Sequence, residues 1–404
     1  MTASAPVAAQ LGGGLGGGLP VDLPETVGRV REAVGDIVAP VADPAGAVLR
    51  DVRALARERV RRLADFVAEH GDTVEWDEKR QPAVRGEVLL LDPDAASIET
   101  ARRAGFALLE KSEIEGLGVA YARFATPSGM PLAKAVEALR KAVPDREVTA
   151  DQIHFRSGRT PNAGGRQDAP SAPLPRGGTV GIIDGGIAGS GRVAAQRGFA
   201  AGAPRASDHA SAIASLLAGA GTTRIYGADV YGDDPAGGNA LAIARALGWM
   251  QGQGVPVVSV SLVGPANPLL ARAVASARGK GMVIVAAVGN DGAAAPPAYP
   301  ASYSGVLAVT GIDGAGRVLI EAGRAAHLDY AAPGADMSAL VPGKGRVSLR
   351  GTSYAAPLAA SRMAARLTAL GNMEKASRAL DAEALKGRSR TGRGVLCNIC
   401  RSGL

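Results

Sequence analysis

The chain contains few aromatic residues, few cysteines and few histidines. Phe, Trp and Tyr make up 3% of its 404 residues while 47% are hydrophobic, so the core must be built mainly from Ala, Val, Leu and Ile. The two cysteines, Cys397 and Cys400, cannot close a four-coordinate zinc site by themselves. Their C-N-I-C spacing predicts either a local disulfide or two free thiols. A thioredoxin-like role is not favoured, because the motif does not lie between a strand and a helix.

Long apolar runs and clustered positive charge are also absent. No stretch reaches the roughly 18 apolar residues of a membrane span, which predicts no transmembrane segment. The net charge is +7, but the arginines are spread widely without an aromatic-rich basic block, so we expect no nucleic-acid binding. No complete signal peptide is present. The small apolar residues 5–9 are either what remains of a trimmed signal peptide or a flexible start.

The first part of the chain divides by composition into a tail, a helical segment and a small domain. Residues 1–24 are glycine-rich and predict a flexible tail or signal remnant. Residues 25–80 carry apolar side chains at helical spacing with arginines between them, which favours a solvated basic face packed on a neighbour over a membrane-surface helix. Residues 81–156 show the order β-α-β-β-α-β of a ferredoxin-like unit.

The second part predicts an α/β domain that follows a linker. Residues 157–177 are rich in Gly, Pro, Ser and Arg and predict the linker. In residues 178–396, continuous apolar strands alternate with helical patterns, which indicates a parallel sheet with helices on both faces. Residues 397–404 form a predicted C-terminal tail. The clearest strands are Thr179–Ile183, Val255–Leu262 and Met282–Val288, and the helical patterns lie around 239–251 and 267–278.

Four residues in this domain are of types that catalyse acyl transfer. Asp184 ends an apolar strand, where open α/β sheets form their sites. His209 stands near the start of a helical, largely apolar stretch, and Ser353 stands where a helix begins. Asn290 ends another strand, and its amide can donate to an oxyanion. Taken singly, each is more simply a turn former, a core histidine or a helix cap.

Taken together, these residues follow one of the known orders for a catalytic triad: Asp, His, Ser. The motifs around them resemble those of the subtilases, the subtilisin-like serine peptidases, over about residues 178–396. In chain order they read I-I-D-G-G-I, D-H-A-S-A-I-A-S-L-L-A-G, V-S-V-S-L-V-G-P, A-A-V-G-N-D-G, Y-P-A-S-Y-S-G-V-L-A-V-T, Y-A-A-P-G-A-D-M and G-T-S-Y-A-A-P.

The resemblance implies a seven-stranded parallel sheet and hydrolysis of protein or peptide substrates. By analogy with the family, Ser353 is the nucleophile, His209 its base, Asp184 the group that orients the base, and Asn290 the oxyanion amide. The strand that lines the main specificity pocket of the family corresponds here to the following residues: Ser261, Leu262, Val263 and Gly264. The family also makes calcium a possible ligand, although no acidic loop stands out as a metal site and no cofactor is expected.

Several neighbours of these residues depart from the family's pattern, including Val263, which separates Leu262 from Gly264 in the substrate-binding strand. Ala210 and Ser211 replace the usual Gly-Thr after the histidine, and Gly185 stands where Ser or Thr often follows the aspartate. These departures leave open a second interpretation, in which the chain is a degraded subtilase that binds peptides or partners without cleaving them. A different acyl hydrolase, such as an esterase, is disfavoured because no G-x-S-x-G elbow is present.

The resemblance has consequences for processing and location. Subtilases commonly carry a ferredoxin-like unit before the catalytic domain, as a folding aid and inhibitor. We therefore expect the N-terminal domain to act as an intramolecular inhibitor, and the chain to cut itself between about Arg156 and Gly178. Because an active peptidase endangers a cell's interior, we expect a secreted or periplasmic protein.

Overall fold

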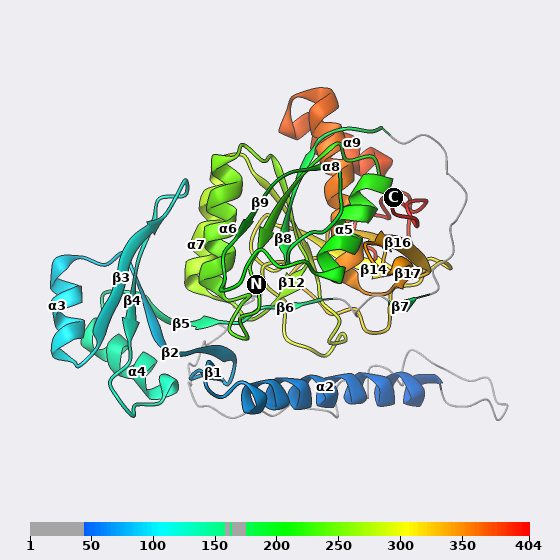
Figure 1. The fold of residues 1–404 in the computed structure, drawn as a ribbon. Coiled ribbons are helices and arrows are strands. Elements are labelled where there is room, and N and C mark those ends of the chain that lie inside the picture. Colours follow the sequence, from blue (N-terminus) through cyan, green and yellow to red (C-terminus); the bar gives the residue numbers. More distant parts are fainter. Residues whose placement is uncertain (1–43, 158–161, 164–174) are drawn as a thin grey trace, which may run out of the picture. The chain divides into compact units, whose positions relative to one another are not determined.

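The computed structural model describes residues 44–157, 162–163 and 175–404. Within them, the larger domain is built on a parallel seven-stranded sheet in the order β15-β14-β13-β11-β8-β10-β9. Figure 1 shows helices on both sides of this sheet. The prediction of a parallel sheet with helices on both faces is thereby confirmed. The strands are β8 (Thr179–Asp184), β9 (Val193–Gly198), β10 (Arg224–Asp229), β11 (Val257–Val260), β13 (Val283–Ala287), β14 (Leu307–Ile312) and β15 (Tyr330–Pro333).

Alternate residues of each strand face opposite helical layers, because side chains of a strand point alternately to its two faces. In β13, Val283, Val285 and Ala287 join the core formed with α5 (Asp208–Gly219) and α8 (Ala355–Leu370). Ile284 and Ala286 join the other core, formed with α6 (Ala240–Gly252) and α7 (Pro268–Gly279). Burial on both faces explains why these strands are continuously apolar.

The predicted strand Val255–Leu262 is divided in the structure. Its first part is β11, inside the parallel sheet, and Ser261 separates it from β12 (Leu262–Val263). Strand β12 leaves the sheet and pairs antiparallel with β6 (Phe155–Arg156), which lies far upstream in the chain. The apolar run does not distinguish these two parts, because residues of both are buried.

The small upstream unit has the element order β-α-β-β-α-β and an antiparallel sheet. Strand β2 pairs with β4, β5 and β1, and β3 pairs with β4. Two helices cover one face of this sheet, whereas Leu89, Leu91 and Tyr121 on its other face share a core with α6 and α7. The elements are β2 (Pro82–Leu91), α3 (Ala95–Arg103), β3 (Ala107–Ile114), β4 (Val119–Ala125), α4 (Leu132–Ala142) and β5 (Val148–Gln152).

The predicted helical segment 25–80 is only partly helical in the structure. Helix α2 (Pro44–Glu69) ends before β1 (Val74–Trp76), which pairs with β2 and so extends the small sheet. Helical periodicity ends at the His70-Gly71 turn, and three residues are too few for a strand to show its own period. The predicted tail 1–24 and residues 25–43 lie outside the described residues.

Two regions predicted as irregular contain ordered pairing. In the linker 157–177, β7 (Asn162–Ala163) pairs with β17 (Gly345–Leu349), which itself pairs with β16 (Met337–Val341). The predicted C-terminal tail, residues 397–404, is held by the disulfide Cys397–Cys400 and by the N–H of Leu404, which donates to Ser215 O at 3.1 Å. Composition alone does not reveal such short pairings, because partners distant in sequence supply them.

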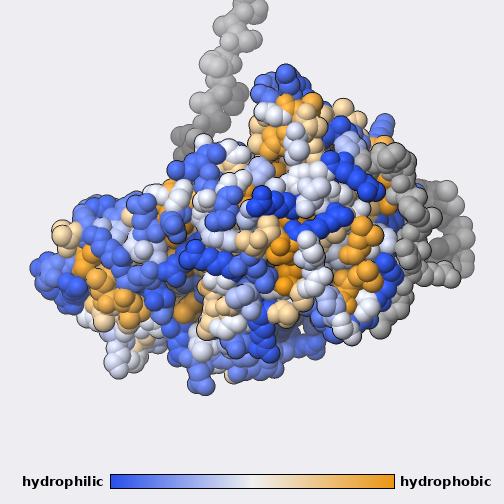
Figure 2. Space-filling model, turned by 45° about the horizontal axis from the view of Figure 1, so that its top comes forward, coloured by the Kyte–Doolittle hydropathy of each residue, from blue (hydrophilic) through white to orange (hydrophobic). Residues whose placement is uncertain are grey.

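The remaining helical elements follow the large sheet. The 3-10 helix η1 (Thr352–Tyr354) leads directly into α8, and α9 (Met373–Glu383) packs beside α8. None of the helices in the described part of the chain combines the length and apolarity needed to cross a membrane. On the face drawn in Figure 2, hydrophobic residues form several patches among hydrophilic ones.

Candidate active site

Three elements bring together the predicted triad residues. Asp184 is the last residue of β8, His209 is the second residue of α5, and Ser353 lies in η1 at the start of α8. Parallel strands end at one edge of their sheet, and connections leaving that edge gather the side chains of a site there. All three residues are buried.

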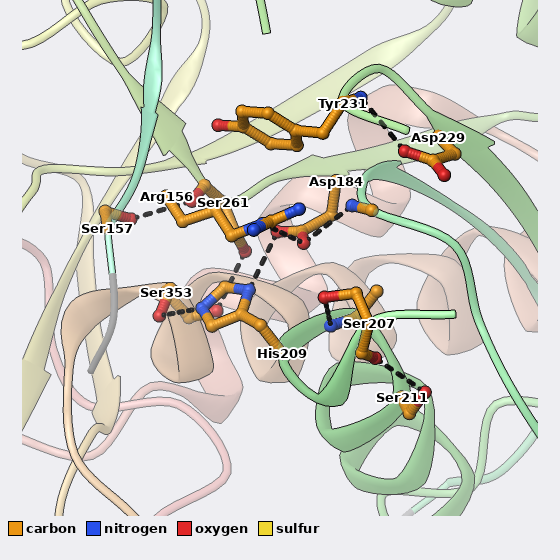
Figure 3. A network of polar contacts seen from close by, with 12 residues as sticks. Arg156, Ser157, Asp184, Ser207, His209, Ser211, Asp229, Tyr231, Ser261 and Ser353 are labelled. Carbon is orange, nitrogen blue, oxygen red and sulfur yellow. Dashed lines mark hydrogen bonds and ion pairs between the residues drawn. The ribbon is translucent and has the colours of Figure 1, made fainter. Parts of the chain in front are cut away.

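The imidazole of His209 lies between the other two side chains (Figure 3). Its Nδ1 is 2.9 Å from Asp184 Oδ2, and its Nε2 is 2.9 Å from Ser353 Oγ. A carboxylate at Nδ1 requires the tautomer with its proton there, which leaves Nε2 free to accept a proton from the serine hydroxyl. This is the geometry in which a histidine can act as a general base toward a serine.

The carboxylate of Asp184 is kept charged by its neighbours. Burial by itself raises the pKa of Asp184, because it disfavours the charged form. The charge and hydrogen bond of His209, the charge of Arg156 and the N–H of Gly185 outweigh burial, and the resulting pKa is below its ordinary value. A charged Asp184 is suited to stabilise an imidazolium during proton transfer.

The structure explains why residue 185 is a glycine and shows where Ala210 lies. A Cβ at Gly185 would lie 2.7 Å from the Cβ of Ser207, so a larger residue does not fit without movement. Ser207 is the N-cap of α5, and its Oγ accepts from the N–H of Ala210 at 3.5 Å. Ala210 is fully buried in the core. Neither departure displaces Asp184 or His209 from the arrangement described above.

Asn290 contacts Thr352, the residue before Ser353. Its Oδ1 accepts from the N–H of Thr352 at 3.0 Å, which fixes the orientation of the amide. Its Nδ2 is buried and has no acceptor within the described residues. The nearby N–H of Ser353 donates to the carbonyl oxygen of Ser157 at 3.3 Å. Asn290 therefore holds an unused buried donor beside a backbone donor that already engages a peptide carbonyl.

A segment of the chain itself lies along the predicted substrate-binding strand. Phe155 pairs with Val263 and Arg156 with Leu262, in antiparallel register. Beyond this pair, the N–H and Oγ of Ser157 both donate to the carbonyl oxygen of Ser261, at 3.0 and 2.9 Å. The structure thus brings three of the predicted substrate-binding residues against an extended peptide.

The same segment is held on its other side. The N–H of His154 donates to Gly238 O at 2.8 Å, and Ile153 forms a bridge with Asn239. The ring of His154 packs on Gly264, where a Cβ would lie 2.5 Å from the ring's Cδ2. Gly264, the fourth residue predicted to bind substrate, therefore also contacts the segment, and only a glycine fits there.

A cavity of about 650 Å³ opens beside Ser157. Val263, Gly264 and Asn290 line it, and so do Leu55 and Arg59 of α2. In the described ranges, no group of three or more His, Cys, Asp or Glu side chains is placed to hold a metal ion.

Sequence reasoning missed three residues of this site: Arg156, Ser157 and Tyr231. The guanidinium of Arg156 lies 4.0 Å from the ring centroid of Tyr231, and its Nε lies 3.5 Å from Asp184 Oδ1. Arg156 is the last residue of the predicted ferredoxin-like unit and Ser157 the first of the predicted linker, and no local pattern indicates a role in the site for either. Tyr231 follows β10, which is not a continuous apolar run because it contains Arg224 and Gly227. Nothing in the sequence around Tyr231 indicates a role in the site.

Comparisons with known proteins find matches for the domain that carries this site. The family model described as the subtilase family matches residues 179–387. Subtilisin BL of Lederbergia lenta is 36% identical over 143 residues, which are 35% of this chain and 52% of that protein. Subtilisin DY of Bacillus licheniformis is 32% identical over 197 residues, which are 44% of this chain and 72% of that protein. The chain thus spans about half the length of subtilisin BL, the first of these relatives.

Solved structures show a similar fold. Fervidolysin from Fervidobacterium pennivorans, a keratinolytic enzyme related to subtilisin, has a TM-score of 0.64 at 16% identity and covers 79% of this chain and 61% of its own. The epidermin leader peptide processing serine protease of Staphylococcus aureus has a TM-score of 0.58 at 15% identity, covering 78% of this chain and 97% of its own. At such identities the likeness concerns the fold alone.

Proposed function

Because this chain belongs to the subtilase family, we propose that it is a serine endopeptidase made as a self-cleaving zymogen. The observation that carries the proposal is the position of Ser157. Its carbonyl oxygen accepts from the N–H of Ser353, whose hydroxyl lies 2.9 Å from His209. The bond that follows Ser157 is therefore the one that we expect the chain to cut.

The proposed reaction uses each group in the role its contacts suit. Ser353 Oγ attacks the carbonyl carbon while His209 Nε2 takes its proton, and the imidazolium then gives that proton to the leaving amine. Asp184 holds the ring and stabilises its charge. The N–H of Ser353 and the Nδ2 amide of Asn290 receive the oxyanion. Water completes the cycle by hydrolysing the acyl-enzyme, again with His209 as base.

We propose that the upstream unit, residues 81–156, remains as an inhibitor after the cut. Its docking is supported by polar contacts with the first turns of two helices. Asp151 Oδ1 accepts from the N–H of Leu241 in α6 at 3.0 Å. Asn267, the N-cap of α7, donates through Nδ2 to Ala150 O at 3.0 Å and to Gln152 Oε1 at 2.6 Å. Before the cut, the covalent link gives the unit a high effective concentration at the cleft. After the cut that advantage is lost, and these contacts alone hold the unit there.

Helix α2 adds a second contact near the cleft. Arg59 Nε lies 3.2 Å from Asp291 Oδ2, and Arg62 Nη2 lies 2.8 Å from Asp291 Oδ1. Asp291 directly follows Asn290, the proposed oxyanion donor. These partly exposed ion pairs are each worth only about 0–1 kcal/mol. They therefore favour the closed state but do not by themselves determine it.

We further propose that the protein works outside the cytosol, secreted or in the periplasm. The disulfide Cys397–Cys400 supports this, because disulfides persist in oxidising compartments. Cell fractionation with alkylation of free thiols tests the proposal. Recovery of the native protein wholly in the cytosol with both thiols free contradicts it.

A serine-directed fluorophosphonate probe tests the catalytic assignment on the full chain. We expect covalent labelling of Ser353, located by peptide mass spectrometry, and no labelling in Ser353→Ala. The matched variant His209→Ala keeps the serine but loses the base, so we expect its labelling rate to fall by orders of magnitude. An unlabelled wild-type chain that still binds peptides supports the peptide-binding interpretation instead.

A further inference from the structure

The side chain of Arg156, which is 36% exposed, lies against Tyr231 and Asp184 in the candidate active site (Figure 3). Arg156 comes directly before Ser157, and its backbone pairs with Leu262. Its guanidinium lies between the ring of Tyr231, at 4.0 Å from the centroid, and Asp184, at 3.5 Å from Nε to Oδ1. A flat, polarisable cation is thus held by an aromatic face on one side and a buried carboxylate on the other.

Gly185 provides the space for this side chain. A Cβ at position 185 would lie 2.9 Å from Arg156 Nη2, so the guanidinium would have to shift if residue 185 carried a side chain. The glycine that departs from the family's usual residue therefore leaves room for the guanidinium in its present position.

The aromatic wall is built into the catalytic domain. The N–H groups of Tyr231 and Gly232 donate to Asp229 Oδ1 at 2.9 and 3.0 Å. Asp229 is fully buried, and its Oδ2 accepts from the N–H of Arg205 at 2.7 Å. The hydroxyl of Tyr231 donates to His154 O at 2.8 Å. Because Asp229 fixes the loop that carries the ring, a substrate from outside meets the same wall.

From these contacts we infer that the recess formed by Tyr231, Asp184 and Gly185 selects arginine in substrates, at the residue before the one whose carbonyl is attacked. This inference rests on the proposed endopeptidase function and names its substrate class: extended peptides with Arg followed by a small residue such as Ser. Arginine suits the recess better than lysine, because a planar guanidinium stacks on an aromatic ring and offers several donors to a carboxylate.

The contacts also determine which kinetic constant changes. The guanidinium touches Tyr231 and Asp184 with the serine not yet bonded, so the stabilisation is present in the bound ground state as well as in the transition state. Such uniform binding lowers KM and leaves kcat nearly unchanged. A cation beside Asp184 also shares the carboxylate with His209, which gives no reason for kcat to rise.

The test compares peptides that differ only at this residue, as His-Phe-X-Ser p-nitroanilides with X as Arg, Lys, Ala or Leu. The full chain is used as produced. Its own upstream unit competes equally with every peptide, so the ratio of KM values is unaffected by that competition. We expect a KM about tenfold lower for Arg than for Ala, the size of a partly desolvated cation–π contact.

Two variants of the wall separate recognition from a structural effect. Tyr231→Phe keeps the ring, so we expect it to keep the Arg-to-Ala ratio of KM values. Tyr231→Leu removes the ring, and we expect the ratio to fall to roughly threefold or less. Equal KM values for the Arg and Ala peptides in the wild type overturn the inference while turnover upholds the proposed function. Absence of turnover with every peptide, and of probe labelling at Ser353, removes the proposed function and the inference with it.

Discussion

The backbone N–H of Ser353 donates to the carbonyl oxygen of Ser157 at a distance of 3.3 Å. The donor belongs to the residue whose hydroxyl faces His209, and the acceptor belongs to a segment paired with the strand next to the site. One contact therefore links the proposed catalytic machinery to the proposed inhibitor. The same binding mode fits the segment as a substrate before the cut and as a product after it.

The first prediction concerns Asn290, whose Nδ2 is a buried donor without an acceptor in the described residues. Replacing it with Ala should lower kcat for peptide hydrolysis by about 10²–10³-fold, a general figure that itself comes from subtilisin. The reason is the loss of one donor to the oxyanion, with little change in KM. Steady-state kinetics on a peptide substrate measure both constants.

The matched control for this variant is Asn290→Asp. It keeps an oxygen to accept from the N–H of Thr352, which now lies 3.0 Å from Asn290 Oδ1, but it removes the donor. We expect Asn290→Asp to lose as much activity as Asn290→Ala. Near-normal turnover in Asn290→Asp means that the amide serves only to position Thr352.

A second prediction follows from Asp151, a buried carboxyl at the docking surface of the upstream unit. Burial, helped by the negative charge of Glu87, raises the pKa of Asp151 from 3.8 to about 7. It outweighs the N–H of Leu241 and the charges of Arg123 and Arg245, which lower that pKa. Because its pKa is raised in the folded, docked state, Asp151 stabilises that state at pH values below its ordinary pKa of 3.8. This stabilisation is lost as the pH rises through about 7. Docking should therefore weaken from pH 4 to about pH 7.

The variant Asp151→Asn isolates this effect, because it keeps an acceptor for Leu241 but does not titrate. In a Ser353→Ala background, which keeps the chain whole, urea midpoints of the two proteins are compared from about pH 4 to 8. Relative to Asp151→Asn, the parent should lose stability on the order of 3–4 kcal/mol across that range. A difference between the urea midpoints of the two proteins that does not change with pH contradicts the prediction.

A third prediction concerns His154, whose ring is fully buried against Gly264. Burial outweighs hydrogen bonds to the backbone at Gln152 and Pro265 and lowers the pKa of His154 from 6.5 to about 4. The docked state favours the neutral ring of His154. Its contribution to the stability of the folded, docked state is therefore present above pH 6.5 and is lost as the pH falls toward 4. This effect opposes that of Asp151 within the same range.

The two effects are separated in the Asp151→Asn, Ser353→Ala protein. The free energy of unfolding of this protein should fall by about 3 kcal/mol between pH 6.5 and 4, relative to the same protein carrying His154→Gln. Urea midpoints at a series of pH values give the difference. Parallel curves for the two proteins show that the docked imidazole is protonated as readily as the exposed one.

The sequence was sufficient to identify the residues that gather at the sheet edge. Asp184, His209, Ser353 and Asn290 lie at strand ends or helix starts, and the structure places them within contact of one another or of adjoining residues. Local patterns were informative here because a parallel sheet, once recognised, fixes where its strand ends meet. The roles assigned to these residues remain predictions for the experiments above.

The sequence was not sufficient to place the segment that occupies the cleft. Phe155 and Arg156 end the predicted ferredoxin-like unit and Ser157 begins the predicted linker. Their structure comes from pairing with Ser261, Leu262 and Val263 far along the chain. Their register is a tertiary property with no local signature. The recess for Arg156 was missed for the same reason: it joins Gly185 and Tyr231, which lie on different loops.

The most direct test of the account is to map the termini of the purified full chain. We predict that the wild type separates into two fragments, with a new N-terminus at Gly158, the residue after Ser157 in the sequence. Ser353→Ala should remain at 40.6 kDa, because it lacks the nucleophile. The control Ser348→Ala, which changes an exposed serine of β17, should be cut like the wild type. A wild-type chain that stays intact while it hydrolyses peptides, or a Ser353→Ala chain cut at the same bond, contradicts the account.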